Sequence, residues 1–458
     1  MRKRFSLERA WHAIIPAFGT DGDVYPFVGL GAELLKRGYQ ATIATHEHFA
    51  KHAEAAGLRF VPLVSQAETD ELVKQEDLWD YLKGPFVISR WAAKMMAHQY
   101  GVLSALLSER GAFMVASPGV VAARIIQEIT GVPLISVILQ PWVIPSIYAP
   151  PVMMGGLTLP RWAPTPIGKL YIRLFNEAGP LLLGPEFKRL RTTLGLPPIG
   201  RFFDWWHSPD LILAMFPEWY GEPQADWPKQ IRLAGFPIND SRPETNISEE
   251  TLAFCRMGKP PIAFTFGTGM MHAGELVRLG IAACEAIGMR GIILTKYRNQ
   301  LPAKLPRFIH HSSFEPFQKL FPQCAAVVHH GGVGTVAKAF ASATPQVILP
   351  FAFDQLDNAI RVKRLGVGGY CDARSRSSTA WIQILREILK TSTIQRAKQM
   401  KKKFCSRSGL ELAADLIERH LANASNCDAT FWCNRSHQDF RRQPAFATEA
   451  VRLNQLAD

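Results

Sequence analysis

Short apolar runs alternate with longer stretches of mixed polarity through the first half of the chain. Five runs are compact and apolar enough to form strands buried on both faces of a sheet, namely 12–18, 41–45, 59–63, 114–117 and 133–137. Between them, three stretches have the spacing of helices, namely 27–36, 46–56 and 120–129. Gly38 and Gly57 follow the first two helices as C-caps do. This order predicts a doubly wound parallel sheet.

The same alternation returns after residue 260 and predicts a second α/β unit. Its expected strands are 261–266, 291–295, 308–310, 325–328 and 346–349. Helices are expected at 274–287 and, after the turn that ends at Thr335, to about residue 342, and the amphipathic stretch 409–421 would close the unit. We therefore predict an α/β fold with two Rossmann-like, doubly wound domains that face each other across a cleft. Ligands would lie beyond the carboxyl ends of the strands.

Two stretches break this alternation. From 140 to 196 prolines crowd among aromatic and apolar residues, and two interpretations stay open: a wall of an apolar pocket, or a loop packed on the domain for stability. Residues 217–260 carry many prolines and charges with little periodicity. The predicted organisation is an N-terminal domain, an interdomain linker, a C-terminal domain with its closing helix, and an extended or disordered tail, at 10–235, 236–260, 261–421 and 422–458.

The most informative stretch follows the strand 325–328. There, His329-His330-Gly331-Gly332-Val333-Gly334-Thr335 joins the strand to the next helix. Glycines let the backbone approach a ligand closely, and the free N–H groups and dipole of a helix start attract an anion such as a diphosphate. A tight turn that merely requires glycine is the alternative. The pair Asp354-Gln355, at the end of the following strand, favours a ligand site.

Two other turns at predicted strand ends carry similar residues. Gly267-Thr268-Gly269 is a second amide-rich turn in the C-terminal half, and a weak signal by itself. In the N-terminal half, Gly19-Thr20-Asp21-Gly22-Asp23-Val24-Tyr25-Pro26 follows the first strand. Two domains that face each other would set this loop opposite the loop 331–335.

The composition, with 47% apolar and 20% charged residues among 458, is that of a packed globular protein. Seven scattered cysteines without a CxxC pair indicate neither a zinc ribbon nor a disulfide framework, and they fit a reducing cytoplasm. The basic N-terminal stretch lacks the cleavage pattern of a signal peptide, and no apolar run is long enough to span a membrane. A cytoplasmic location is therefore expected.

The formal net charge is +13, and about half of this excess lies in residues 374–458, densest at 401–403. Three interpretations stay open: simple solvation, peripheral contact with an anionic membrane, and contact with nucleic acid. Nucleic acid is the least favoured partner, because no nucleic-acid-binding module accompanies the charge.

Taken together, these motifs resemble those of the nucleotide-sugar glycosyltransferases of the two-domain GT-B fold. The resemblance is strongest to the bacterial branch that includes macrolide and glycopeptide glycosyltransferases and sterol glucosyltransferases. Its most specific piece is the stretch 329–335, followed by Pro345, Pro350 and Asp354-Gln355. The stretch 19–26 supports it independently, and the resemblance runs from about residue 11 to 421.

The resemblance implies that the C-terminal domain holds a nucleoside diphosphate sugar as a co-substrate, without any other cofactor. The expected contacts to the diphosphate are His330, Thr268 and the helix-start residues Gly332, Gly334 and Thr335. Phe314 and the backbone of Phe317 would flank the base. Asp354 and Gln355 would accept and donate hydrogen bonds to the sugar hydroxyls. Fixed donors of this kind stabilise the charge that a departing diphosphate gains.

By the same resemblance the N-terminal domain binds the acceptor, and Asp23 is the predicted general base. The residues expected to support its loop are Gly19, Thr20 and Gly22. Many relatives place a histidine in this turn. An aspartate, with a reference pKa of about 3.9, is a weaker base but can accept the proton late, as the attacking hydroxyl acidifies. The alternative is that Asp23 caps a helix beginning near Pro26, and one residue could do both. Asp21 is the next choice of base.

The predicted function is transfer of a hexose or deoxyhexose from a nucleoside diphosphate sugar, preferably a UDP sugar, to a hydroxyl of an apolar small-molecule or lipid acceptor. Attack opposite the leaving nucleotide would invert the anomeric centre, and no metal is needed if His330 and the helix start hold the diphosphate. Two alternatives are a catalytically silent nucleotide-sugar-binding or accessory protein, and a nucleotide-sugar 2-epimerase. An epimerase needs no acceptor, which leaves 140–196 without a role.

Several properties are not determined by the sequence, namely the donor base and sugar, the acceptor, the oligomeric state and the role of the tail. Two residues depart from the family pattern. Lys338 stands where relatives often carry an acidic or amide residue near the ribose, and Ala343 replaces a usual glycine.

Overall fold

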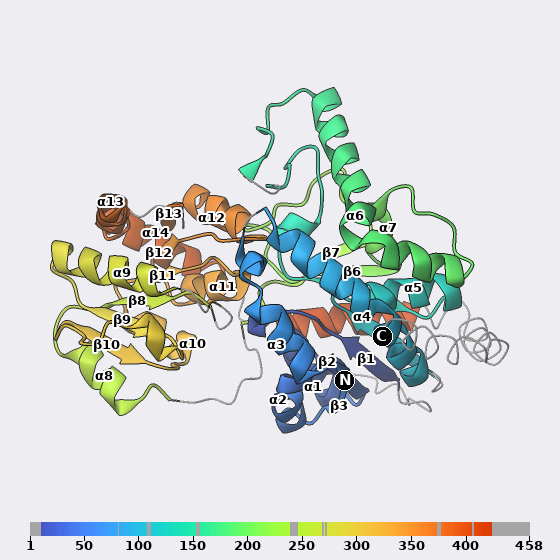
Figure 1. Ribbon diagram of the computed structural model, residues 1–458, viewed down its shortest axis with the longest axis horizontal. Coiled ribbons are helices and arrows are strands. Elements are labelled where there is room, and N and C mark those ends of the chain that lie inside the picture. Colours follow the sequence, from blue (N-terminus) through green and yellow to red (C-terminus); the bar gives the residue numbers. More distant parts are fainter. Residues whose placement is uncertain are drawn as a thin grey trace, which may run out of the picture.

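The computed structural model describes residues 11–80, 82–107, 111–152, 156–238, 246–267, 270, 273–372, 377–404 and 407–423. Alternating strands and helices form two all-parallel sheets there, which confirms the predicted α/β class (Figure 1). The tail predicted at 422–458 lies almost wholly outside the described residues. Within them, no helix combines the length and the apolar character needed to cross a membrane.

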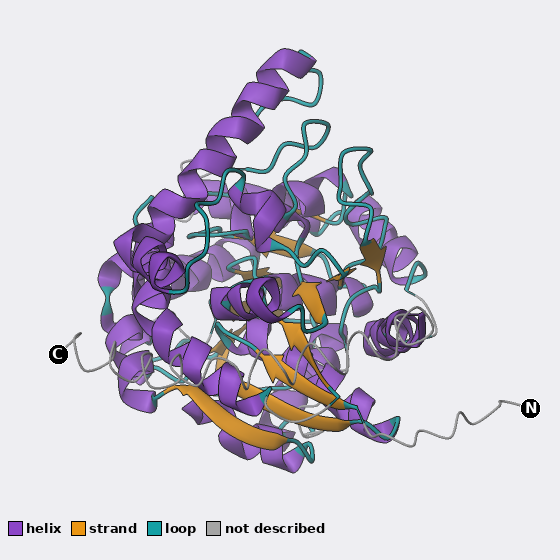
Figure 2. Cartoon of the chain, turned by 90° about the vertical axis from the view of Figure 1, so that its right-hand side faces the viewer, coloured by secondary structure: helices purple, strands orange, loops and turns teal. Residues whose placement is uncertain are grey.

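The first sheet has seven strands in the order β3-β2-β1-β4-β5-β6-β7. Its strands are β1 (His12–Pro16), β2 (Gln40–His46), β3 (Arg59–Val64), β4 (Ala112–Ala116), β5 (Leu134–Ile138), β6 (Leu211–Ala214) and β7 (Ile231–Leu233). The helices between them are α1 (Asp21–Lys36), α2 (Ala50–Ala55), α3 (Gln66–Lys74), α4 (Gly84–Leu106), α5 (Val121–Thr130), α6 (Thr165–Thr193) and α7 (Phe202–Trp206). The central strand β1 is buried over its whole length, because helices surround the sheet (Figure 2).

The second sheet has six strands in the order β10-β9-β8-β11-β12-β13. Its strands are β8 (Ile262–Thr265), β9 (Gly291–Leu294), β10 (Ile309–Ser312), β11 (Ala326–His329), β12 (Gln346–Ile348) and β13 (Gly368–Tyr370). The associated helices are α8 (Glu249–Arg256), α9 (Gly274–Ile287), α10 (Phe317–Leu320), α11 (Val333–Ala341), α12 (Gln355–Arg364), α13 (Ser378–Ile388) and α14 (Thr391–Lys401). Because β8 and β11 are neighbours in the middle of the sheet, the turns that follow them meet at one edge.

The prediction that the first helix begins at Phe27 is wrong, because α1 begins at Asp21. Thr20 is the N-cap, and the side chain of Asp23 returns to it in a capping box. Pro26 therefore lies inside the helix, where it supplies no N–H to the carbonyl of Gly22. As a consequence, the polar residues of the predicted loop form the first turn of a helix.

The stretch 140–196 contains a long helix, which neither of its two sequence-based interpretations included. The helix α6 covers Thr165–Thr193. Pro166 lies in its first turn, where proline costs little, and Gly184 interrupts it with a left-handed φ of 72° directly before Pro185. The prolines therefore divide this segment into helical pieces and do not exclude helix.

The last described helix, 409–423, packs against the N-terminal half (Figure 1). Arg37, at the end of α1, donates hydrogen bonds to Asp415 (2.8 Å) and Glu418 (2.7 Å). Ile417 and Leu421 lie in the same buried cluster as β1 and β2 residues. The chain thus returns to its first half after completing the second, and this contact helps to fix the two halves relative to each other.

Candidate active site

The loop after β11 is shaped by its glycines. Gly331 has a φ of 101°, and a Cβ there would lie 2.7 Å from Ile348 Cγ2. A Cβ at Gly332 would lie 2.6 Å from His330 Nε2. These two positions therefore require glycine: Gly331 packs against Ile348 and Gln355, and the missing side chain of Gly332 leaves room for the His330 ring. The helix α11 starts at Val333 with Gly332 as its N-cap, so its positive end points at the loop.

The two adjacent histidines have different roles. His329 is fully buried; its Nδ1 accepts a hydrogen bond from the Gly331 amide (3.1 Å), and its Nε2 lies 3.0 Å from Gln346 Oε1. His330 carries a buried Nδ1 that has no hydrogen-bond partner among the described residues. Burial lowers the pKa of His330 to about 4, which keeps the ring neutral at pH 7. The loop therefore does not depend on this nitrogen, whereas both ring nitrogens of His329 hold the loop in place.

Among the other residues expected to contact the diphosphate, one amide already has a hydrogen-bond partner. The amide of Thr335 already donates to the Gly332 carbonyl (3.0 Å), as the first turn of α11 requires. A Cβ at Gly267 would lie 3.2 Å from His330 Cε1, so the turn after β8 borders the His330 ring. Thr268, expected to contact phosphate, lies outside the described residues.

Asp354 and Gln355, the pair expected to bind the sugar and called the sugar-binding pair below, stand at the start of α12. Gln355 is buried, and its Oε1 accepts hydrogen bonds from the amides of Phe351 (2.7 Å) and Ala352 (3.2 Å). Because both acceptor positions of this oxygen are filled, the NH2 group is what Gln355 offers to a ligand. Asp354 is partly buried, and its Oδ2 accepts a hydrogen bond from Asn358 Nδ2 (2.7 Å). The pair therefore presents one donor and one acceptor.

Asp354 is electrostatically unusual. Burial and the nearby charge of Asp23 raise its pKa to about 7, although the hydrogen bond from Asn358 acts in the opposite direction. The residue before it, Phe353, has a φ of 58°, a left-handed conformation that is unfavourable for an aromatic residue. Strain of this kind is common at functional sites. Ala343 has a similar φ of 57°, a conformation that glycine adopts at lower cost than alanine.

A buried network that the sequence did not reveal holds this edge of the site. The hydroxyl of Tyr220 donates to Asn358 Oδ1 (2.7 Å), and Asn358 Nδ2 donates to both Asp354 and the Gly331 carbonyl (2.9 Å). Tyr220 and Asn358 are completely buried. Arg361 adds a hydrogen bond to the Tyr220 carbonyl (2.9 Å). One asparagine thus connects the glycine loop, the sugar-binding pair and the N-terminal half.

In the N-terminal loop, Asp23 is positioned by Thr20. Asp23 Oδ2 accepts from the Thr20 amide (2.9 Å) and from its hydroxyl (3.0 Å). Gly19 has a φ of 130°, and a Cβ there would lie 2.5 Å from Asp23 Oδ2, so only glycine leaves space for the carboxylate. Burial raises the pKa of Asp23, the two hydrogen bonds from Thr20 lower it, and the charge of Asp21 raises it; the net shift is upward. Through its hydrogen bonds with Thr20, Asp23 forms part of the cap of α1, which starts at Asp21 and not near Pro26 as the sequence suggested.

His46, at the end of β2, makes a hydrogen bond to the same loop. Its Nε2 accepts a hydrogen bond from the Gly19 amide (3.3 Å), and its Nδ1 lies 3.0 Å from Thr69 Oγ1. Phe18 and Trp91 stack on the ring. Burial lowers the pKa of His46 to about 3, so the imidazole stays neutral and accepts the amide hydrogen.

The structure brings the two predicted loops together. A Cβ placed on Gly334 would lie 4.0 Å from the Cα of Gly22, so the start of α11 faces the start of α1. The charge of Asp23 is also one of the causes of the raised Asp354 pKa. The N-terminal loop, more than 300 residues earlier in the sequence, therefore borders the sugar-binding pair.

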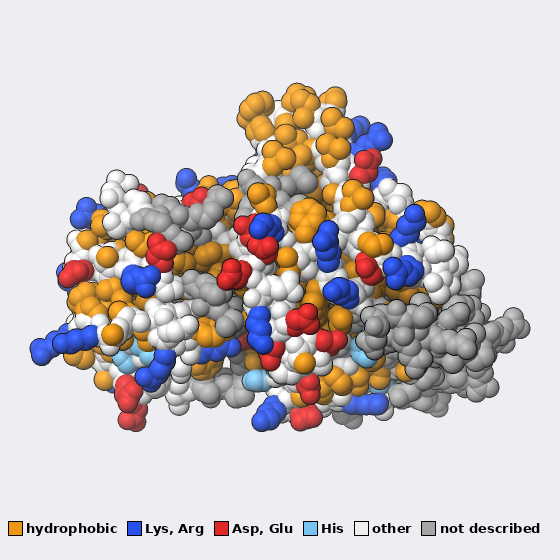
Figure 3. All heavy atoms as spheres, viewed as in Figure 1, with side chains coloured by type: hydrophobic (Ala, Val, Ile, Leu, Met, Phe, Trp, Pro, Cys, Tyr) orange, Lys and Arg blue, Asp and Glu red, His pale blue; other side chains and the backbone are white. Residues whose placement is uncertain are grey.

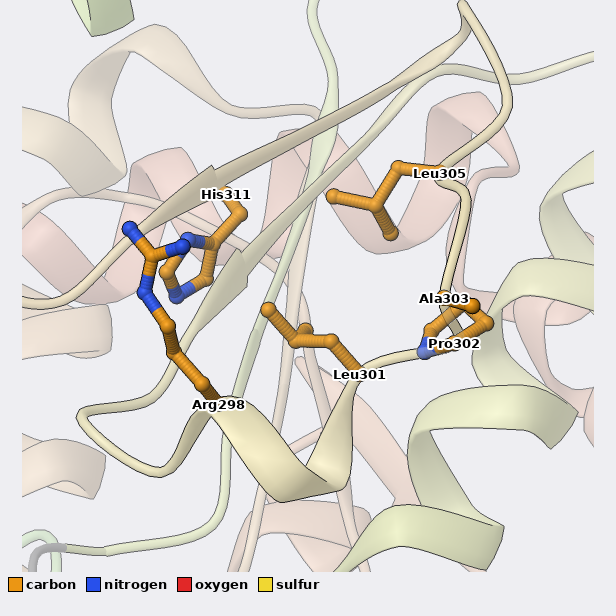
Figure 4. A pocket seen from close by; sticks show the side chains of 6 residues that line it. All are labelled: Arg298, Leu301, Pro302, Ala303, Leu305 and His311. Atoms are coloured by element: carbon orange, nitrogen blue, oxygen red, sulfur yellow. The ribbon is translucent and has the colours of Figure 1, made fainter.

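The two phenylalanines expected to flank the nucleotide base differ from each other in exposure. Phe314, directly after β10, is 54% exposed and free to cover a ligand. The side chain of Phe317 stacks on Phe321, so only its backbone is available, as the prediction stated. Nearby lies a cavity of about 360 Å³, whose lining residues, Arg298, Leu301, Pro302, Ala303, Leu305 and His311, include none of the predicted site residues (Figure 4).

Three residues of the site were missed at the sequence level: Tyr220, Asn358 and His46. Asn358 lies one helical turn after Asp354, and this i, i+4 spacing was the available signal. Tyr220 and His46 carried no comparable signal, because their partners are distant in the chain.

Two family models match the chain. The glycosyltransferase family 28 N-terminal domain matches residues 13–149, and the erythromycin biosynthesis protein CIII-like C-terminal domain matches residues 289–418. Among curated relatives, glycosyltransferase GtfE of Amycolatopsis orientalis is 28% identical, with 88% of this chain and 96% of that protein covered. Sterol 3-beta-glucosyltransferase UGT80B1 of Arabidopsis thaliana is 24% identical, with 91% of this chain and 69% of that protein covered.

Solved structures show the same fold. The kitacinnamycin glycosyltransferase superposes with a TM-score of 0.70 at 19% identity, over 90% of this chain and all of the other. Glycosyltransferase VinC in complex with dTDP superposes with a TM-score of 0.59 at 17% identity, again over 90% of this chain and all of the other. These neighbours show the GT-B fold. The two matched family models and the relatives identify the chain as a UDP-glycosyltransferase-like, hexosyltransferase-like enzyme that transfers a glycosyl group from a nucleotide sugar.

Proposed function

We propose that the enzyme transfers a hexose or deoxyhexose from a UDP sugar to a hydroxyl of an apolar small molecule or lipid, with inversion at the anomeric carbon and without a metal ion. The observation that carries the proposal is the approach of the two loops, with Gly22 against Gly334 and Asp23 beside Asp354. This arrangement would set a carboxylate opposite the group that holds the leaving diphosphate, as an in-line displacement requires.

On the donor side, His330 supplies the key contact in this proposal. Its Nδ1 has no partner among the described residues, and the ring would turn so that this nitrogen donates a hydrogen bond to a phosphate oxygen. The amides of Gly332 and Gly334 at the start of α11 would add further donors. As the bond between the anomeric carbon and the phosphate oxygen breaks, the nucleoside diphosphate leaves with the electron pair. Donors that are already in place stabilise this growing charge, so the proposal needs no metal.

The sugar would be held by Asp354 and Gln355. The Gln355 amide would donate to one hydroxyl, since its oxygen is bound to the backbone of residues 351 and 352. The Asp354 carboxylate would accept from the neighbouring hydroxyl, and Asn358 keeps it in place. Such a pair fixes the orientation of the ring, so that the anomeric carbon faces the N-terminal loop.

Asp23 would act as the general base. Its Oδ2 is occupied by Thr20, which leaves Oδ1 to receive the acceptor proton while the acceptor oxygen attacks the anomeric carbon. The upward shift of the Asp23 pKa makes the carboxylate a better base than an ordinary aspartate. In this proposal, capping α1 and accepting the proton use different oxygens of one side chain.

An apolar acceptor is supported by the surroundings and by one relative. The loop before α6 reaches the site, because a Cβ on Gly156 would lie 3.5 Å from Leu356, the residue after Gln355. This loop belongs to the apolar stretch 140–196. A curated relative is called a sterol glucosyltransferase, which names an apolar acceptor for that protein.

The test is product analysis with a panel of UDP and dTDP sugars, each with and without sterol, terpenoid, polyketide and lipid acceptors. Mass spectrometry should detect a glycosylated acceptor, and NMR should show a β linkage from an α donor, both in the presence of EDTA. Retention of configuration would contradict the inverting mechanism. A C2 epimer formed without acceptor would indicate an epimerase, and nucleotide binding without turnover would indicate a silent relative.

The predicted membrane contact through residues 374–458 stays a prediction. More than a third of that segment lies outside the described residues.

A further inference from the structure

The first half of α6 projects from the N-terminal half of the molecule, and its outward side is apolar (Figures 1 and 3). We call this surface the α6 apolar face. Its members are exposed by 49–83% and are Leu157, Trp162, Ile167, Leu170, Leu174 and Leu181. Four of them, at 167, 170, 174 and 181, lie along one side of the helix at spacings of three, four and seven. A continuous exposed apolar surface of this kind marks a contact site.

The face is presented by a well-anchored helix. On the opposite side of α6, Gly168 packs against Ile147, with 3.3 Å between its Cβ position and Ile147 Cβ. The hydroxyl of Tyr171 donates to the carbonyls of Pro151 (2.8 Å) and Leu157 (3.1 Å). Phe175 is buried below it. Because the inner side of the helix is already packed, the outer leucines have no further place in the core and remain exposed.

Basic residues border the apolar face. Arg161, Lys169 and Arg173 are exposed on the same projection. Arg161 also lies close enough to Arg364, at the end of α12, for its charge to contribute to the lowered pKa of that guanidinium. The acidic residue on this half of α6 is Glu177, which pairs with Arg173 (3.0 Å). The border is therefore net positive and complements an anionic surface.

The position of the face connects it to the site. Residue 156 contacts Leu356 beside the sugar-binding pair, and the apolar face begins at the next residue, Leu157. An apolar molecule that lies against this projection is therefore one loop away from the N-terminal catalytic loop and Asp354. A water-soluble acceptor would gain no binding free energy from contact with an apolar surface.

We propose that the α6 apolar face docks on an anionic lipid bilayer. Trp162 and the leucines would enter the boundary between headgroups and acyl chains, while Arg161 and Lys169 contact the headgroups. An apolar acceptor would pass from the bilayer along the loop 156–163 to the site. The last step rests on the proposed function, whereas the docking itself does not.

Self-association through this face is disfavoured by its charges. In a two-fold symmetric dimer the same surface meets itself, so the net positive borders of both copies would lie in one interface. Like charges in an interface oppose association. An anionic bilayer meets the same residues with opposite charge, which is why we choose it as the partner.

The test is vesicle sedimentation of the full chain. We expect binding to phosphatidylcholine vesicles with about 30% phosphatidylglycerol, and several-fold weaker binding to pure phosphatidylcholine or at high salt. The double variant Leu170→Ser/Leu174→Ser should bind anionic vesicles at least about tenfold more weakly, because two leucines that would be buried in the bilayer are lost. The double variant Arg161→Glu/Lys169→Glu should lose the preference for anionic lipid. Met257→Ser, at an exposed apolar residue on the other half of the protein, should bind as wild type does.

Three outcomes would overturn the docking proposal. Wild type that stays in the supernatant, or leucine variants that bind as wild type does, would exclude docking by this face. A wild-type dimer in sedimentation velocity that becomes a monomer in Leu170→Ser/Leu174→Ser would assign the face to self-association. Two controls show whether a variant is folded: its melting temperature, and its hydrolysis of the nucleotide sugar without vesicles. If wild type itself shows no hydrolysis, this counts against the proposed function and not against docking.

Discussion

The two loops that meet at the site differ in how their polar groups are held. Around the loop 331–335, three polar side chains have fixed partners: His329 binds Gly331, Gln355 binds the backbone before it, and Asn358 binds both Gly331 and Asp354. His330 Nδ1 has no partner among the described residues. In the N-terminal loop, the hydrogen bonds found for Asp23 within the described part of the chain both come from Thr20, and the Gly19 amide makes a long contact of 3.3 Å to His46. The proposed donor side is therefore held by more hydrogen bonds than the proposed catalytic side.

The difference suggests a division of labour. A diphosphate needs several donors fixed in advance, because each donor that must first be ordered reduces the gain from binding. An acceptor of variable shape needs only one carboxylate at the correct place. The relative position of the halves is then set by groups outside the loops, namely Tyr220 with Asn358 and Arg37 with the helix 409–423.

The largest expected effect is on Asp23. Asp23→Asn should lower kcat by about 10²–10⁴-fold, because the amide still accepts from Thr20 but cannot take a proton. The KM for the nucleotide sugar should change little. In wild type, the upward-shifted pKa means that kcat/KM falls with decreasing pH sooner than an ordinary aspartate would cause. Steady-state kinetics from pH 5 to 8 measure both effects.

The matched control is Asp21→Asn in the same helix turn, with an expected change of less than about threefold. If Asp21→Asn loses as much activity as Asp23→Asn, Asp21 is the base. If neither variant loses activity, the N-terminal loop supplies no base at all.

His330→Ala should weaken binding of UDP or dTDP by about 10–100-fold, since one hydrogen bond to a charged group contributes about 1.5–3 kcal/mol. The melting temperature should stay within a few degrees, because the His330 Nδ1 makes no bond to the described residues. Isothermal titration calorimetry gives the affinity. His98→Gln, at an exposed histidine far from the loop, is the control. Unchanged affinity in His330→Ala would remove this residue from the diphosphate site.

Tyr220→Phe tests the connection between the halves. The variant leaves Asn358 Oδ1 buried without its partner, which should cost about 1–3 kcal/mol in the free energy of unfolding. The KM for the donor should rise several-fold, as Asn358 loosens its hold on Asp354. Chemical denaturation and kinetics are the measurements. Tyr148→Phe, at a half-exposed tyrosine, should change neither. A stability loss without any change in KM would show that the network is purely structural.

The smallest expected effect concerns Asp354 and pH. Its pKa, raised to about 7 in the folded protein, means that the folded state holds a proton that the unfolded state releases above about pH 4. Its contribution to stability is therefore present below pH 4 and is lost as the pH rises through about 7. Asp354→Asn, which is neutral throughout, should melt about 1–3 °C above wild type at pH 8 and show a smaller difference at pH 5. The opposite trend would contradict the raised pKa.

Local patterns in the sequence determined the two α/β halves and both loops. Strand and helix periodicity depends on neighbours in the sequence, so the predicted helix 274–287 matches α9. The glycines at 331 and 332, which the sequence marked as part of a turn, occupy positions that exclude a Cβ. The resemblance to the GT-B glycosyltransferases came from the same short motifs, and the family comparisons confirm it.

Only the tertiary structure decided what happens between distant residues. Helix α1 begins at Asp21 because Thr20 and Asp23 cap each other, and no periodicity marks that choice. Tyr220 and Asn358 are 138 residues apart, and Arg37 and Asp415 are 378 apart, so their contacts depend on how the halves pack. The raised pKa of Asp354 arises from burial and from Asp23 in the other half. Sequence patterns report local geometry, whereas burial and charge at a junction exist only after folding.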